Sequence, residues 1–389
     1  MEYQGDQVRI PCVIYRGGTS KAVIIKRNDL PPEQPLRNRL LMSIFGSPDP
    51  RQVDGLGGGD TLTSKFALIG PPTREGTDVD YTFAQVSPDR PIVDWKGNCG
   101  NISSAVGPFA IDEGLVDAVE PVTTVRIHQV NMDRVIIAHI PTEGGRPRVE
   151  GDFAIDGCPG MGAKIDLDFG DFAGSTTGKL LPTGNEVDRL DVEGVGKIEA
   201  SIVDAANPLV FLRARDLGLT GIETPNEIDT NAKLMDKLER IRGKAAQMIG
   251  LVEDWRKAAT ESLYIPFIAY VREPVAYPSW TTGKEIKAED VDVVSRLLFM
   301  GWTHKTYPIT GTVATGVAAR IPGTIVNEML PKRTERKKTV EIGHPAGVVS
   351  IEAEVAKNGS QFEIRKAMVG RTARRIMEGY TFVRQSVFA

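Results

Sequence analysis

The chain has 389 residues, of which 41% are hydrophobic and 25% are charged, as in an ordinary globular protein. Its net charge of −4, from 47 basic and 51 acidic side chains, excludes long-range attraction for nucleic acid. The three cysteines do not make a disulfide framework in so long a chain, and their odd number leaves a free thiol. Since the first residues are polar and no run of about 18 apolar residues occurs, we expect a cytoplasmic protein without signal peptide or membrane span.

A chain of this length exceeds one hydrophobic core, so we expect two domains of roughly 150 to 200 residues with a cleft between them. A stretch rich in Gly and Asp, residues 152–188, separates two groups of predicted elements. We place the domain boundary at its end, near Gly184. The expected domains are therefore residues 1–184 and 185–389.

Short β-type runs dominate the first third of the chain, separated by Gly, Pro and Asp turns that are typical of hairpins. One helix is expected over residues 36–45, because Pro35 suits its first turn and Gly46 suits the position after its end. The predicted strands cover residues 8–15, 21–26, 65–70, 81–86, 123–130 and 134–140.

The second half of the chain begins with two further strand-like runs, at residues 198–203 and 209–212. A long amphipathic helix follows, because apolar residues recur at helical spacing over residues 234–255. Two acidic residues suit the first turn of another helix, which we expect over residues 288–300. A last, short helix is predicted after Thr310.

A weak internal repeat appears when residues 99–106 are set beside residues 310–317. Each segment is a turn that runs into a nearly uncharged, buried helix, the first beginning just after Cys99 and the second after Thr310. Two related halves would each direct a helix N-terminus at a shared cleft, where backbone N–H groups bind anions. A chance match between small residues is the alternative.

Two side chains could exchange protons with a substrate. Cys99 stands at a predicted helix start, where N–H groups and the helix dipole lower a thiol pKa from its free value of about 8.5. Lys65 follows a Gly-rich loop and precedes an apolar strand, so partial burial could lower its pKa and make it a base. Lowering that pKa from about 10.4 to about 7 takes roughly 4 to 5 kcal/mol. A buried structural cysteine and an exposed lysine are the alternative interpretations.

Two Gly-rich segments, residues 16–21 and 57–64, supply backbone donors and hydroxyls that suit a carboxylate, although plain turns would look the same. Neither has the spacing of a P-loop or a dinucleotide fingerprint, so nucleotide binding is not expected. The four histidines are scattered and no cysteine pair shows ligand spacing, so we expect no metal. His304, just before the last predicted helix, is either a substrate contact or structural.

Taken together, these motifs resemble the 2-methylaconitate isomerase (PrpF) family over essentially the whole chain, most specifically around Lys65 and Cys99. The matching segments are Arg16-Gly-Gly-Thr-Ser-Lys21, Gly57-Gly-Gly-Asp60 with Ser64-Lys65, Gly97-Asn-Cys-Gly-Asn101, Asn207-Pro208, His304-Lys305 and Ala318-Ala-Arg-Ile-Pro-Gly323.

The resemblance implies an α+β fold of the diaminopimelate-epimerase type: two similar domains, each with sheet wrapped around a central helix, and the active site in the interdomain cleft. It implies an isomerase without a cofactor. Its reaction would be an allylic 1,3-shift or a cis-trans isomerisation on an unsaturated di- or tricarboxylate such as 2-methylaconitate, aconitate or 4-oxalomesaconate. The expected partner is that small acid, with no nucleic acid and no membrane. The oligomeric state stays open, a homodimer being the commonest assembly.

The family's lysine and cysteine correspond to Lys65 and Cys99, its loop serine to Ser20, and its histidine before the second helix to His304. From their positions beside these motifs, and because an acid with two or three carboxylates needs fixed cations, we expect further substrate-binding residues. Arg320 is one more candidate cation, and Ser279 and His344 are looser candidates. The set comprises Arg16, Thr19, Lys21, Ser64, Asn98, Gly100, Asn101, Arg272, Ser279, Thr310, Gly311 and Thr312.

The chain departs from the family at Ala22, where glycine is usual, and the added methyl could narrow the loop and alter substrate choice. Epimerases that share the fold have a cysteine at both helix starts, whereas Thr310 stands at the second start here. A two-thiol racemase is therefore disfavoured. The alternatives are an amino-acid epimerase or PhzF-like isomerase of the same fold, and a polycarboxylate-binding protein without catalysis.

Overall fold

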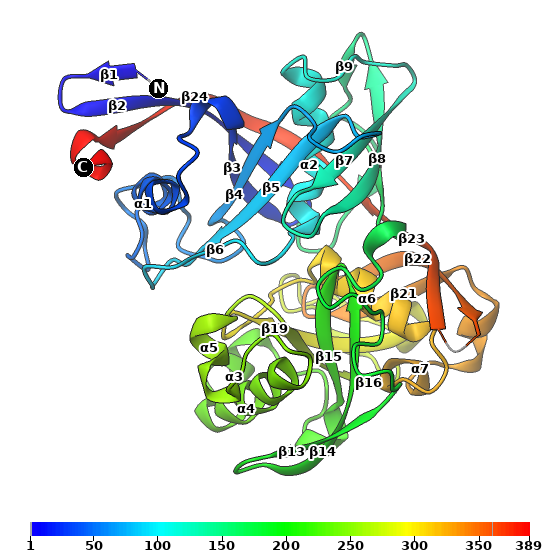
Figure 1. Cartoon of the computed structure of the whole chain (residues 1–389). Helices are drawn as coiled ribbons and strands as arrows, with labels where there is room; N and C mark the ends of the chain where they lie inside the picture. The colour runs from blue at the N-terminus through cyan, green and yellow to red at the C-terminus, as the bar shows by residue number, and fades with distance from the viewer. Residues whose placement is uncertain (1, 360) are drawn as a thin grey trace. The chain divides into compact units, whose positions relative to one another are not determined.

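The computed structural model describes residues 2–359 and 361–389 and forms two compact units. The first unit takes the chain up to Leu167 and again from Arg371 to Ala389, and the second takes Asp168–Gly370 (Figure 1). These bounds differ from the expected domains 1–184 and 185–389, because the last strand of the chain returns to the first unit.

The first unit is built on a mixed sheet that begins at the edge strand β24 and continues through β2, β3, β4, β5, β7 and β8. The β3–β4 and β5–β7 neighbours are parallel and the others antiparallel. The strands are β1 (Glu2–Gln4), β2 (Gln7–Gly17), β3 (Ser20–Lys26), β4 (Lys65–Gly70), β5 (Val79–Val86), β6 (Val93–Asp94), β7 (Val122–Gln129), β8 (Arg134–Glu143), β9 (Arg146–Pro147), β10 (Phe153–Ala154), β11 (Met161–Gly162) and β24 (Ala373–Arg384), while β12 (Ile165–Asp168) leads into the second unit.

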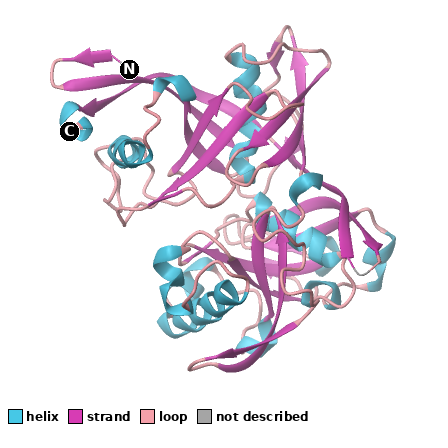
Figure 2. Ribbon diagram, in the orientation of Figure 1, coloured by secondary structure: helices cyan, strands magenta, loops and turns pink. Residues whose placement is uncertain are grey.

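Two α-helices belong to this unit in the part of the chain that the structure describes. Helix α1 (Gln34–Phe45) has Pro35 in its first turn and ends at Gly46, whose φ of 72° lies in the left-handed region, as the sequence predicted. Helix α2 (Gly100–Asp112) is buried from Gly100 to Ile111 and packs against β2, β3 and β8, so the strands surround it (Figure 2). Its helical bonding begins when the Ser103 N–H donates to the Cys99 carbonyl.

The second unit repeats this arrangement in the order β13, β14, β15, β16, β19, β21, β22 and β23, with β15–β16 and β19–β21 parallel. Helix α6 (Ile309–Ala319) is buried along its whole length, like α2. The strands are β13 (Asp188–Val192), β14 (Gly196–Ala205), β15 (Asn207–Arg213), β16 (Phe267–Arg272), β17 (Tyr277–Pro278), β18 (Glu285–Ile286), β19 (Val293–Phe299), β20 (Trp302–Thr303), β21 (Thr339–His344), β22 (Gly347–Asn358) and β23 (Gln361–Arg371). The other helices are α3 (Pro225–Asp229), α4 (Ala232–Met248), α5 (Ala258–Glu261) and α7 (Ile325–Glu328).

The two units repeat the same strand order around a buried helix, and the helices begin at the two segments of the expected internal repeat. Cys99 is the N-cap of α2, whereas Pro308 is the N-cap of α6 and Thr310 lies in its first turn, where the Thr312 N–H donates to the Pro308 carbonyl. The pairing of residues 99 and 310 stays a prediction.

Two helix predictions in this unit are wrong. Residues 288–300 form a short 3-10 turn and then β19, because a strand that is buried on both faces is as uniformly apolar as a buried helix. The amphipathic helix stops at Met248 instead of reaching residue 255, and Gly250 turns the chain with a φ of 77°. Among the described residues, no helix is long and apolar enough to span a membrane.

Candidate active site

Lys65 is the first residue of β4 and is almost completely buried, with 2% of its surface exposed. Its neighbours are set by sheet register, because Lys65 lies opposite Ala22 on β3 and Gln85 on β5. The Nζ atom donates to Gln85 Oε1 at 2.7 Å and lies 5.5 Å from the centre of the Phe83 ring. These contacts therefore hold the amine in the buried interior of the first unit.

Burial lowers the pKa of Lys65 from its ordinary value, because the ammonium loses its hydration. Negative charge on Cys99 and on Asp60 opposes this shift, as does a hydrogen bond with the Cys99 side chain. The structure thus brings the amine and the thiol within hydrogen-bonding range of each other. A buried amine whose pKa is lowered can be neutral and act as a base.

Cys99 is buried and forms the N-cap of α2. Its carbonyl accepts from the Ser103 N–H at 2.9 Å and from Ser103 Oγ at 3.1 Å, which holds the first turn of the helix. Asn98, also buried, accepts from Ser103 Oγ at 3.4 Å, and Gly100 is the first residue of the helix. The thiol consequently stands at the N-terminal, positive end of a buried helix.

The turn between β2 and β3 lies against the same helix start. A Cβ on Gly17 would collide with the Asn101 carbonyl, so the approach requires glycine. Asn101 Nδ2 donates to Thr19 Oγ1 at 3.2 Å. The Ser20 hydroxyl is buried and has no hydrogen-bond partner among the residues that the structure describes, so it can accept or donate to a ligand.

Arg371 is a further cation at this place that the sequence did not reveal. Its Nε donates to Asn101 Oδ1 at 3.2 Å, and only 4% of the residue is exposed. Burial lowers the pKa of its guanidinium to about 9, and the charge of Cys158 opposes the shift. Since Arg371 is separated from Asn101 by 270 residues, no local pattern could have indicated the contact.

Of three other residues predicted in the first unit, Arg16 and Ser64 have structural contacts and Lys21 faces away from Ser20. Arg16 donates to the carbonyls of Gly18 and Thr372 at 3.0 and 2.9 Å, and so closes the turn. The Ser64 hydroxyl donates to Gln52 Oε1 at 2.6 Å. Lys21 is partly exposed and follows Ser20 along β3, so its side chain points to the opposite face of the sheet.

In the second unit, a buried polar group surrounds the start of α6. Asn207 Nδ2 donates to Thr310 Oγ1 at 3.0 Å, and Thr312 Oγ1 donates to the Pro308 carbonyl at 3.0 Å. Gly311 packs closely on Leu297, because a Cβ there would meet its side chain. The pair of Asn207 and Thr310 repeats that of Thr19 and Asn101 in the first unit.

Both histidines predicted in this unit are buried. His304 Nδ1 accepts from the Thr306 N–H, and His344 Nδ1 accepts from the Ala346 N–H, each at 3.2 Å. A neutral imidazole with this contact carries its proton on Nε2 and can donate from there. Ser279 Oγ donates to the Ala346 carbonyl at 2.8 Å, which places it beside the turn after His344.

The two predicted arginines of this unit do not join that polar group. Arg272 ends β16, whose beginning pairs with the beginning of β15 near Asn207, so it lies at the opposite end of the strand. Its Nη1 donates to the Thr220 carbonyl. Arg320 holds a loop, since it donates to the carbonyls of Ala353, Thr334, Lys337 and Thr339.

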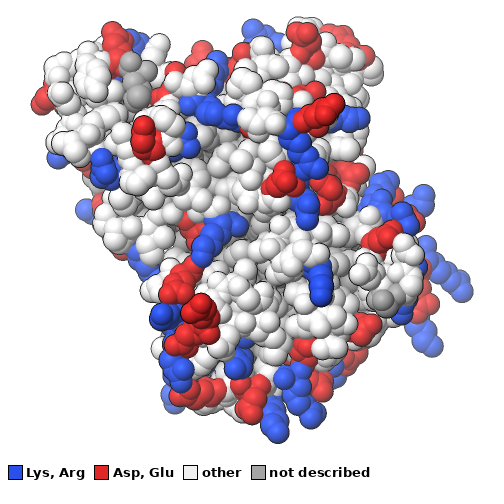
Figure 3. All heavy atoms as spheres, in the orientation of Figure 1, with Lys and Arg blue, Asp and Glu red and all other residues white. Residues whose placement is uncertain are grey.

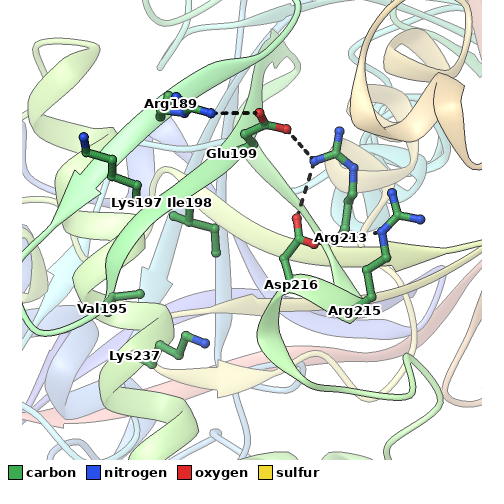
Figure 4. A pocket seen from close by; sticks show the side chains of 9 residues that line it. All are labelled: Arg189, Val195, Lys197, Ile198, Glu199, Arg213, Arg215, Asp216 and Lys237. Atoms are coloured by element: carbon green, nitrogen blue, oxygen red, sulfur yellow. Dashed lines mark hydrogen bonds and ion pairs between the residues drawn. The ribbon is translucent and has the colours of Figure 1, made fainter.

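A surface groove of about 660 Å³ in the second unit contains none of the predicted residues (Figure 4). Its central Arg213 binds Glu199 at 2.9 Å, Asp216 at 3.4 Å and Glu328 at 2.7 Å, so its positive charge is matched by carboxylates. Basic and acidic side chains are likewise intermixed on the face seen in Figure 3. No group of three or more potential metal ligands occurs among the described residues.

Comparison with known proteins gives a family match over nearly the whole chain. A family model described as PrpF protein matches residues 7–384. The 3-methylitaconate isomerase of Eubacterium barkeri is 52% identical over 381 residues, covering 98% of this chain and 99% of that protein. The 2-methyl-aconitate isomerase of Shewanella oneidensis is 40% identical over 390 residues, covering 97% of each.

Solved structures agree on the fold. A crystal structure of methylitaconate-delta-isomerase, 51% identical, covers 99% of this chain and 98% of its own with a TM-score of 0.81. A hydroxyproline epimerase from Agrobacterium vitis is only 12% identical but covers 96% of this chain and 92% of its own with a TM-score of 0.59. The expected epimerase-like α+β fold is confirmed.

Proposed function

The chain belongs to the PrpF family, as its motifs predicted, and on this premise we propose that it is an isomerase that moves a proton on a small unsaturated di- or tricarboxylate without a cofactor. The observation that carries the proposal is the buried amine of Lys65, whose pKa is lowered, beside the Cys99 thiol at a helix N-terminus. The relative with 52% identity makes 3-methylitaconate the first substrate to test.

Proton transfer would begin with the neutral Lys65 amine. Its lone pair takes a proton from a carbon that lies next to the double bond, and the electron pair of that C–H bond delocalises over the allyl system and the adjacent carboxylate. Cys99 or the Lys65 ammonium then returns a proton at the other end of the allyl system. The double bond has moved, and no oxidant, reductant or metal is consumed.

Negative charge on this intermediate needs donors that are already in place. The N–H groups at the start of α2 and the Ser20 hydroxyl supply them in the first unit, and the Arg371 guanidinium supplies a fixed positive charge for a carboxylate. Substrate binding by His304 and Thr310 stays a prediction. The homodimer and the cytoplasmic location also stay predictions.

The experiment is proton NMR in D₂O with 3-methylitaconate, 2-methylaconitate, the aconitates and 4-oxalomesaconate. We expect isomer formation with deuterium entering an allylic carbon. Lys65→Met should lower kcat by about 10³-fold or more, since general acid–base catalysis contributes about 10²–10⁴-fold. The exposed Lys179→Met is the matched control. Normal turnover by a folded Lys65→Met protein would refute the mechanism, and binding without deuterium uptake would favour a binding protein.

An amino-acid epimerase with two thiols is disfavoured by the structure of the second helix start. Neither Pro308, the N-cap of α6, nor Thr310 in its first turn carries a thiol that could serve as the second proton donor. Deuterium entering the Cα of an amino acid would nevertheless identify such an activity in the same NMR assay.

A further inference from the structure

Gln85 is a fully buried side chain directly opposite Lys65 on the neighbouring strand. Its Oε1 accepts from Lys65 Nζ at 2.7 Å. The mechanism above gives this residue no role, and no motif in the sequence marks it. Its contacts nevertheless concern the one amine on which the proposed reaction depends.

The orientation of the Gln85 amide follows from its other contacts. Its Nε2 donates to the carbonyls of Ser64 at 3.0 Å, Thr61 at 3.1 Å and Val86 at 3.4 Å. Carbonyl oxygens only accept, so the nitrogen end must face them and the oxygen end must face Lys65. Because Thr61 and Ser64 lie in the loop before Lys65, the amide ties this loop to the amine.

A neutral amide differs chemically from a carboxylate at the same place. The amide oxygen accepts a hydrogen bond from either form of the lysine, whereas a carboxylate at this distance strongly favours the ammonium. One N–H of the amine points at Oε1, so the nitrogen lone pair points away from Gln85. The contact therefore directs the amine without adding an opposite charge.

We propose that Gln85 is a positioning residue, whose amide oxygen holds the Lys65 amine in the direction needed for proton abstraction while leaving it free to be neutral. The inference rests on the proposed function of Lys65. It adds that the group facing Lys65 must be an uncharged hydrogen-bond acceptor whose oxygen end points at the amine. Neither the family match nor the sequence motifs indicate this requirement.

The test compares Gln85→Glu and Gln85→Met with the wild-type protein. The isosteric Gln85→Glu variant should raise the pKa of Lys65 by at least about one unit, because it adds a buried negative charge. The alkaline shift should appear both in the pH profile of kcat and in an NMR titration of the protein labelled with ¹³C at lysine Cε, with Lys65 assigned by Lys65→Met. Gln85→Met should lower kcat at least 10-fold with little change in KM and no alkaline shift.

Gln52 supplies a matched control, because it is a second buried glutamine that binds the same loop. Its Oε1 accepts from Ser64 Oγ and the Gly59 N–H, and its Nε2 donates to Ser47 Oγ at 3.0 Å. Gln52→Glu should lower the melting temperature but leave the titration of Lys65 where it is in the wild type.

The outcomes separate the two proposals. An unchanged Lys65 titration in Gln85→Glu, or full kcat in Gln85→Met, overturns the role of Gln85. The same shift in Gln52→Glu would also overturn it, since the effect would then come from the loop. If Gln85→Glu shifts the Lys65 titration while Lys65→Met turns over normally, the proposed function is refuted. The contact between Gln85 and Lys65 then still stands.

Discussion

Four buried charged side chains of this protein show two kinds of hydrogen-bond partner. Asp80 binds Arg27, and Asp292 binds Lys337, so these carboxylates are matched by cations. Lys65 and Arg371 instead have a side-chain amide as a partner, and burial lowers both of their pKa values. Matched charges hold the fold, whereas a buried cation with a depressed pKa is typical of a functional site.

The substitution Asp80→Asn tests the stability that comes from a buried carboxylate matched by a cation. Burial raises the pKa of Asp80, but hydrogen bonds from Thr73, His128 and Arg27 outweigh it, so the pKa in the folded protein lies below the ordinary value. The stability from this carboxylate is therefore present above the unfolded pKa of about 3.9 and is lost as the pH falls through the folded pKa. We expect a loss of about 3 kcal/mol at pH 7, measured by urea unfolding.

The difference between the wild type and Asp80→Asn should shrink below about pH 4, because Asp80 takes up a proton first in the unfolded protein and then, as the pH falls through its lower folded pKa, in the folded protein. Asp54→Asn is the control, since Asp54 is largely exposed. A loss of stability that is equal at pH 7 and pH 3 would show that the carboxylate charge is not its source.

Sequence reasoning singled out Lys65 and Cys99 as candidates because each lies in a short motif of its own, and the family resemblance added Ser20. It could not identify Gln85 or Arg371. Gln85 reaches Lys65 through the register of β5 on β4, and Arg371 reaches Asn101 through the return of the chain end. Both contacts are set by tertiary pairing, which leaves no local pattern to read.

At the level of secondary-structure elements, a hairpin turn lies against the start of the buried helix in each unit. In the first unit Gly17 closes on Asn101, and in the second Asn207 binds Thr310. The short β-type runs of the sequence predicted the strands on both sides of each turn. The strand β19 was mistaken for a helix because uniform burial removes the period by which the two are told apart.

Gly17→Ala tests the contact between hairpin and helix. The added Cβ would overlap the Asn101 backbone, which cannot rotate away, so the first turn of α2 must shift. We expect a destabilisation of about 2 kcal/mol in urea unfolding and a lower kcat, because this turn carries Cys99. Gly379→Ala is the control, since its Cβ would only touch Met377 at 3.5 Å. Unchanged stability and kcat in Gly17→Ala would contradict the close approach.

On the scale of the whole molecule, the first unit is closed by the end of the chain. Strand β24 pairs with β2 from Gln7 opposite Arg384 to Gly17 opposite Ala373, and Val383 joins the core of the unit. The sequence predicted two domains but could not predict this return. Strand order along the chain does not tell which sheet a distant strand will join.

A chain that ends after Gly370 should therefore lose the fold of its first unit, because β2 loses its β24 partner and becomes an edge strand, and Val383 leaves the core. Hydrogen exchange followed by mass spectrometry should show fast exchange in β2, β3 and α2, and slow exchange retained in β15, β16 and α6. A chain that ends after Arg384 keeps every pair between β2 and β24 and should exchange like the full protein. Slow exchange of β2 and α2 in the shorter chain would mean that the unit folds without its last strand.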